Sequence, residues 1–226
     1  MLRYLNSAKV KLLARTEKKN SRHMDTQMNL YAASRLELLS QLGAIDIAVP
    51  PLSSGRTKNH AEQWSICRFL ATYNEADFIA FPLRVIHTDK PDYHLSMGTI
   101  TVGVEITTST PPQYAQAIAI RNIFYPNGVI EPELFTWDAP KRTESEIIAI
   151  LKRSSESLHG MGWIGNSVER QWAAGMLKSI TAKLKKLNSH GYGNMARYWL
   201  IIYDNIPQAA LDLNEAMSIL VNQLRS

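Results

Sequence analysis

Cysteine is almost absent from this chain, and no apolar run is long enough to cross a bilayer. Cys67 is the only cysteine among 226 residues, which rules out an internal disulfide, so we expect a reducing, cytoplasmic setting. No apolar run approaches the eighteen or so residues of a membrane-spanning helix, and the basic N-terminal residues lack the apolar stretch of a secretory signal. Low-complexity segments and solenoid-type repeats are also missing. These absences favour a globular protein without a membrane partner.

Basic side chains outnumber acidic ones. The formal net charge is +5 and the isoelectric point is about 9.3, a balance that favours a polyanionic partner such as nucleic acid. Residues 1–22 carry seven Lys and Arg side chains and one acid, Glu17. This segment is compatible with a solvated arm and with a nucleic-acid or membrane-surface contact.

The stretch PDYHLSMGTITVGVEIT, residues 91–107, predicts a β-hairpin. Asp92 precedes the first run, Gly98 lies in the turn, and the second run alternates strictly between apolar and other residues. Glu105 and Thr107 fall on the face opposite the apolar residues of that run. Two carboxylates on neighbouring strands of a basic chain suggest a divalent-metal site for phosphate chemistry.

Helical and strand patterns surround the hairpin. We expect helices over residues 24–42, 59–74, 110–122, 144–158, 168–187 and 208–224, and strands over residues 78–88 and 198–203, the last buried on both faces. Residues 45–49 are expected to form a short strand or extended piece. A Pro- and Ser-rich loop near residue 55 suggests a division into an N-terminal arm and helix (1–55) and a main domain (56–226), with an insertion at about 109–167.

Two further charged residues lie on apolar helix faces. Glu62 points toward the core side of the 59–74 helix, where it could pair with a metal or stabilise the helix N-terminus. Lys183 lies on the flank of the apolar arc of the 168–187 helix, so its stem would be covered and its ammonium aimed along a surface.

The expected elements follow the order helix, strand, strand, strand, helix, strand, with Pro91-Asp92 before the second strand and Glu105 late in the third. Over about residues 56–205 this arrangement resembles the PD-(D/E)xK, or restriction-endonuclease-like, nuclease superfamily. The segments GMGWIGNSVERQW, KLKKLN and YWLIIYDN resemble those of uncharacterised bacterial proteins grouped with it. The resemblance implies an α/β fold with a central mixed sheet of about four strands flanked by helices, here with an N-terminal helical extension.

The resemblance also implies site roles. Asp92, Glu105 and the Ile106 carbonyl would ligate Mg²⁺ or Mn²⁺, and Glu62 would bind or orient the metal. The family lysine two residues after the second acid is replaced here by Thr107. In some members this lysine has migrated to a neighbouring helix, which makes Lys183 the first substitute and Lys186 the second.

The expected function is therefore metal-dependent hydrolysis of phosphodiester bonds in nucleic acid, with DNA the first expectation and a homodimer compatible with cutting a duplex. The missing lysine at Thr107 motivates the alternative of a catalytically inactive nuclease-fold module that binds nucleic acid or a protein partner. Hydrolysis of another phosphoester is a third hypothesis. Separately, His87, Asp89, Asp92 and His94 have spacings that could bind a transition metal.

Overall fold

The computed structural model describes residues 28–51, 54–73, 78–156, 162–189 and 191–226, so the basic arm of residues 1–22 lies outside the described part. In chain order the elements are β1 (Asn29–Ala32), α2 (Arg35–Gly43), α3 (Lys58–Thr72), β2 (Leu83–His87), β3 (Tyr93–Met97), β4 (Ile100–Thr108), α4 (Pro112–Phe124), the 3₁₀ helix η2 (Pro132–Phe135), α5 (Glu144–Glu156), α6 (Ser167–Leu187), β5 (Arg197–Tyr203) and α7 (Leu213–Arg225). The described helices include none that is both long and apolar enough to span a bilayer.

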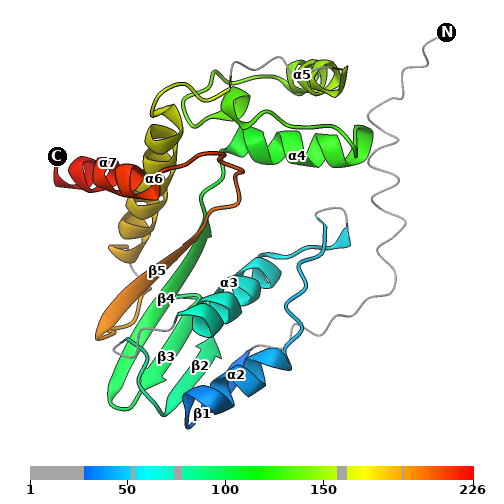
Figure 1. The fold of residues 1–226 in the computed structure, drawn as a ribbon. Helices are drawn as coiled ribbons and strands as arrows, with labels where there is room; N and C mark the ends of the chain where they lie inside the picture. Colours follow the sequence, from blue (N-terminus) through cyan, green and yellow to red (C-terminus); the bar gives the residue numbers. More distant parts are fainter. Residues whose placement is uncertain (1–27, 52–53, 74–77, 157–161, 190) are drawn as a thin grey trace.

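The strands form one mixed sheet in the order β1-β2-β3-β4-β5 (Figure 1). The pairs from β1 to β4 are antiparallel, whereas β5 runs parallel to β4. The predicted hairpin is present, with Tyr93 opposite Val104 and Met97 opposite Ile100. The predicted α/β class with a mixed sheet is therefore confirmed, with five strands instead of about four.

The extra strand, β1, lies where a single helix over residues 24–42 was predicted. Met28, Leu30 and Ala32 are buried and the residues between them exposed, a period of two, whereas Met28 and Ala32 alone also fit a helical spacing of four. Helix α2 begins only at Arg35, because the Ser34 hydroxyl accepts a hydrogen bond from the Glu37 N–H and caps it. The N-terminal helix is thus shorter than predicted.

The two faces of the sheet are covered by different helices. Helices α2 and α3 cover one face, where Leu38, Ile66 and Leu70 pack on Val85, Val104 and other strand residues in the largest core cluster (Figure 1). Helix α6 contacts β4 and β5 on the other face and packs against α7. Because the core cluster includes β1 and α2, residues 28–43 belong to the same sheet and core as the chain after residue 55.

The segment predicted as an insertion builds a core of its own. Helices α4 and α5 and the 3₁₀ helix η2 enclose Tyr114, Ile120, Phe135 and Ile147, and they lie beyond one end of the sheet (Figure 1). The segment contacts α6 closely at Gly175, where a Cβ would come within 2.5 Å of Trp137 Nε1. A side chain at this position would push the two parts apart.

Four other predicted elements differ from the structure. Strand β5 was expected to be buried on both faces, but it is an edge strand whose residues are half-buried or exposed. Strand β2 begins only after Pro82, since proline lacks the N–H that a ladder needs. Helix α7 begins at Leu213, because Asp212 caps it by accepting hydrogen bonds from the N–H groups of Asn214 and Glu215. Residues 45–49 form no strand.

Candidate functional site

The hairpin brings Asp92 and Glu105 to the same face of the sheet. Tyr93 pairs with Val104, so Asp92, one residue earlier, lies across from Glu105 at the start of β3. The Ile106 N–H donates a hydrogen bond of 2.7 Å to Asp92 Oδ2. Both carboxylates are buried, with Asp92 3% and Glu105 7% exposed. Two buried acids this close need cations or hydrogen-bond donors beside them.

Lys183, on helix α6, supplies one of those cations. Its ammonium lies 2.5 Å from Glu105 Oε2 and 3.7 Å from Asp92 Oδ2, although 78 residues separate it from Glu105 in the sequence. The Lys183 side chain is 13% exposed, because its stem lies on the covered flank of α6, as the helical spacing predicted. Lys186, the second candidate, is exposed.

Glu62 joins the same site through a residue that sequence reasoning missed. Lys58, the first residue of α3, places its ammonium 2.5 Å from Glu62 Oε1 and 2.8 Å from Asp92 Oδ1. Glu62 is 4% exposed, so it could not remain charged without a partner. The spacing of four residues from Lys58 to Glu62 was the signal available in the sequence, because residues four apart on a helix are neighbours.

Tyr192, in the loop before β5, is a second missed residue. Its hydroxyl donates a hydrogen bond of 2.9 Å to Glu105 Oε1, so both oxygens of this carboxylate have partners. The neighbouring Tyr198, in β5, pairs with Gly103, where a Cβ would come within 2.7 Å of the tyrosine ring and 2.8 Å of Pro91. Gly103 thus leaves room for the ring beside the acidic site. No sequence pattern identifies either tyrosine.

The surroundings shift the pKa values of Glu62 and Asp92 in opposite directions. Burial raises the pKa of Glu62 and outweighs the hydrogen bond from Lys58. Burial also acts to raise the pKa of Asp92, but the hydrogen bonds from Lys58 and the Ile106 amide prevail and lower it. Partial burial acts to lower the pKa of Lys58, yet its hydrogen bonds to Asp92 and Glu62 raise it overall. Burial and the bond to Glu105 raise the pKa of Tyr192 to about 12.

The acids and lysines form an alternating row across the site. Lys58 joins Glu62 to Asp92, and Lys183 joins Asp92 to Glu105. In the described part of the chain, no three His, Cys, Asp or Glu side chains form a group that could hold a metal ion. A site for Mg²⁺ nevertheless needs only one or two carboxylates, because this ion retains several waters. The Lys183 ammonium lies 2.5 Å from Glu105 Oε2 and 3.7 Å from Asp92 Oδ2, so these two carboxylates face one cation.

The predicted transition-metal group does not come together. His87 pairs with Tyr93 and His94 with Ile86, so the two histidines point to opposite faces of the sheet. His87 Nε2 instead lies 3.7 Å from Glu62 Oε2, and Asp89 is exposed. Cys67 is buried, and burial raises the pKa of its thiol to about 11, which makes it a poor nucleophile.

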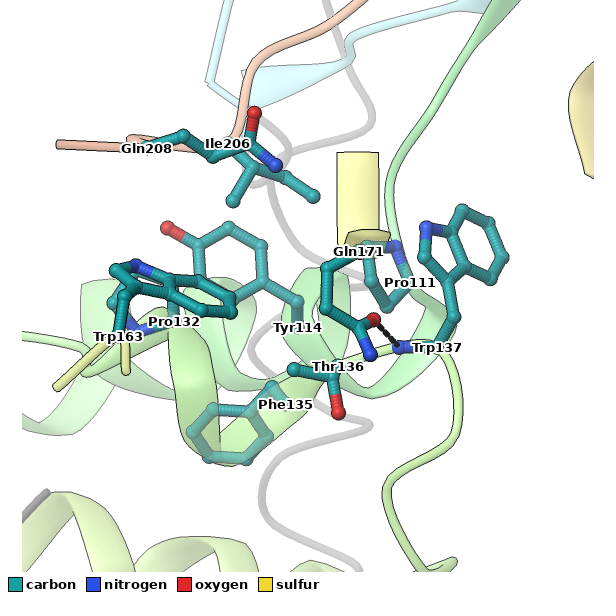
Figure 2. Close-up of a pocket in the computed structure, with 10 residues that line it drawn as sticks. All are labelled: Pro111, Tyr114, Pro132, Phe135, Thr136, Trp137, Trp163, Gln171, Ile206 and Gln208. Carbon is teal, nitrogen blue, oxygen red and sulfur yellow. Dashed lines mark hydrogen bonds between the residues drawn. The ribbon is translucent and has the colours of Figure 1, made fainter. Parts of the chain in front are cut away.

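A hollow between the insertion, α6 and the segment after β5 is lined by aromatic side chains and by no acid. Figure 2 shows Tyr114, Phe135, Trp137 and Trp163 around it, with the backbone N–H of Trp137 donating a hydrogen bond to Gln171 Oε1. It encloses only about 10 Å³, whereas pockets for small molecules hold several hundred. The aromatic residues here are packing anchors, and the acidic row at the sheet is the better candidate for chemistry.

Neither a scan against protein-family models nor searches of curated proteins and of solved structures found a match to this chain.

Proposed function

We propose that this protein is a metal-dependent nuclease that hydrolyses phosphodiester bonds in nucleic acid at Asp92, Glu105 and Lys183, with Glu62 assisting. The observation that carries the proposal is the convergence of Lys183 on both hairpin carboxylates, at 2.5 Å from Glu105 and 3.7 Å from Asp92. A lysine beside two acids is the set that the resemblance to PD-(D/E)xK nucleases implies, with the lysine delivered from α6 instead of from position 107.

The roles follow from the chemistry of the side chains. Asp92 and Glu105 would hold Mg²⁺ or Mn²⁺, which when bound would supply a water of lowered pKa and offset charge on the phosphate. Glu62, which shares the Lys58 ammonium with Asp92, would bind or orient the metal. Lys183 would donate hydrogen bonds to the attacking water or to a phosphate oxygen, where charge develops in the transition state. The role expected for the Ile106 carbonyl as a further ligand stays a prediction. The net charge of +5 supports a polyanionic substrate.

The test is cleavage by Asp92→Ala. Labelled single- and double-stranded DNA and RNA are incubated with wild type and variant in Mg²⁺, with EDTA as the blank. We expect wild-type cleavage that requires the metal and no cleavage by the variant, because one carboxylate ligand is lost. Thermal melting and circular dichroism show whether the variant is folded, and Asp92→Asn serves if the alanine variant is not. Asp89→Ala is the matched control, since Asp89 is an exposed acid three residues away. Wild-type rates in Asp92→Ala would refute the assignment.

One observation favours the alternative of an inactive binding module. Position 107 is threonine, and each of the three acids already lies beside an ammonium group, from Lys58 or Lys183. In this case the protein would bind nucleic acid equally well in EDTA and in Mg²⁺, with no cleavage in either. Mobility-shift titrations run beside the cleavage assay separate the two functions.

A further inference from the structure

The two lysines of the acidic row differ in how firmly they are held. The Lys183 side chain is 13% exposed, whereas that of Lys58 is 69% exposed. Lys58 lies at the first residue of α3, so its stem extends from the helix end with water on most sides. Rotation about its side-chain bonds would carry the ammonium into solvent without moving the backbone.

The two carboxylates that Lys58 contacts are buried, whereas Lys58 itself is largely exposed. Glu62 and Asp92 are 4% and 3% exposed, so neither can turn outward to be hydrated. Three buried acids share two ammonium groups, so the row is short of one positive charge when the acids are ionised. A site with fixed anions and one movable cation is suited to exchanging that cation for another.

We propose that Lys58 is an internal counter-ion that competes with a divalent cation for Asp92 and Glu62 and swings into solvent when the cation binds. The inference rests on the metal site proposed above. In the metal-free protein Lys58 stabilises the buried acids, and in the metal-bound protein the divalent ion takes its place. Lys58 thereby sets the concentration of metal at which the site fills, and it keeps the site closed to weakly binding ions.

The first experiment measures metal affinity in the absence of substrate. Wild type and Lys58→Met are titrated with Mn²⁺ and with Mg²⁺ by calorimetry, and Lys185→Met removes an exposed lysine from α6 as the matched control. We expect Lys58→Met to bind about tenfold more tightly, because a hydrogen-bonded competitor of two carboxylates is removed. Lys185→Met should bind as wild type does. Lys58→Gln replaces the methionine variant if the latter does not fold. Equal or weaker binding by the Lys58 variants would overturn the proposal.

The second experiment follows Lys58 itself. Wild type is treated briefly with an amine-acylating reagent, with and without saturating Mg²⁺, and modification is read by mass spectrometry. The hydrogen bonds that raise the pKa of Lys58 should protect it in the free protein, so we expect its modification to increase several-fold with Mg²⁺. Lys185 is the internal reference. Unchanged or lower modification of Lys58 in the metal-bound protein would overturn the proposal.

The outcomes separate this inference from the proposed function. Tighter metal binding by Lys58→Met together with no cleavage by wild type supports the counter-ion role and refutes the nuclease. Metal-dependent cleavage by wild type with no change in affinity in the Lys58 variants supports the nuclease and refutes the counter-ion role. Absence of metal binding in every variant overturns both.

Discussion

Replacing Lys183 by methionine tests whether this lysine takes the place of the one missing at position 107. Methionine retains most of the apolar stem but removes the ammonium that lies 2.5 Å from Glu105. The second step adds Thr107→Lys in the same chain. Residues 105 and 107 lie on the same face of β4, so the four-carbon stem of a lysine at 107 can bring its ammonium to the Glu105 carboxylate.

The stability lost in Lys183→Met follows from the burial of Glu105. Removing one partner of a buried ion pair costs about 3–5 kcal/mol, because the other charge remains buried. Glu105 keeps the hydrogen bond from Tyr192, so we expect the lower end, a loss of about 3 kcal/mol in the free energy of unfolding. At roughly 2–4 °C per kcal/mol for a chain of this size, Tm should fall by about 6–12 °C. Loss of a donor to the transition state should lower cleavage by about 10²–10³-fold.

The assays are urea unfolding in EDTA and single-turnover cleavage in Mg²⁺. Lys183→Met/Thr107→Lys should recover at least tenfold in cleavage and part of the stability. Lys183→Met/Thr107→Met is the matched control, because methionine adds length without charge. Lys186→Met should lie within about 0.5 kcal/mol of wild type, since Lys186 is exposed. The reasoning is refuted if Lys183→Met is as stable and as active as wild type, or if methionine at 107 rescues as well as lysine.

Two further predictions concern stability. Because the pKa of Glu62 is raised in the folded protein, the folded protein keeps a proton on this carboxyl over a pH range in which the unfolded chain has lost it. The stability that this proton contributes is present below the ordinary pKa of about 4.3 and is lost as pH rises through the raised value. Glu62→Gln should therefore gain stability relative to wild type with rising pH in EDTA, and a stability difference that stays constant as pH rises would contradict this. Gly103→Ala should cost about 1–3 kcal/mol, because the added Cβ would meet the Tyr198 ring at 2.7 Å. Gly43→Ala, with no atom within 4 Å of its Cβ, is the control and should be neutral or stabilising by up to about 1 kcal/mol; equal effects of the two alanines would refute the packing argument.

The elements that the sequence determined are those whose signal is local. Strict alternation over residues 100–107 predicted β4, and Gly98 marked the turn of the hairpin, where φ is +59°. Apolar spacing predicted α3, α5 and α6 within a few residues at each end. The same spacing placed Lys183 on the covered flank of α6, because helical geometry fixes the direction of a side chain before any packing is known.

Only the tertiary structure decided which residues meet and which elements are paired. Residues 29–32 form a strand because they pair with β2 through backbone hydrogen bonds. Without that pairing, their apolar spacing fits a helix as well. Strand β5 is an edge strand because β4 is its one neighbour in the described sheet, a matter of topology that an apolar run does not encode.

The site shows the same division. Asp92, Glu105 and Lys183 could be singled out from the sequence, but their convergence depends on the contact between α6 and β4. The spacing of four residues from Lys58 to Glu62 is visible in the sequence. Lys58 reaches Asp92 across 34 residues and Tyr192 reaches Glu105 across 87, and no periodicity spans such a separation. Side-chain direction is a local property and follows from the sequence, whereas the distance between two side chains depends on the packing of the whole chain.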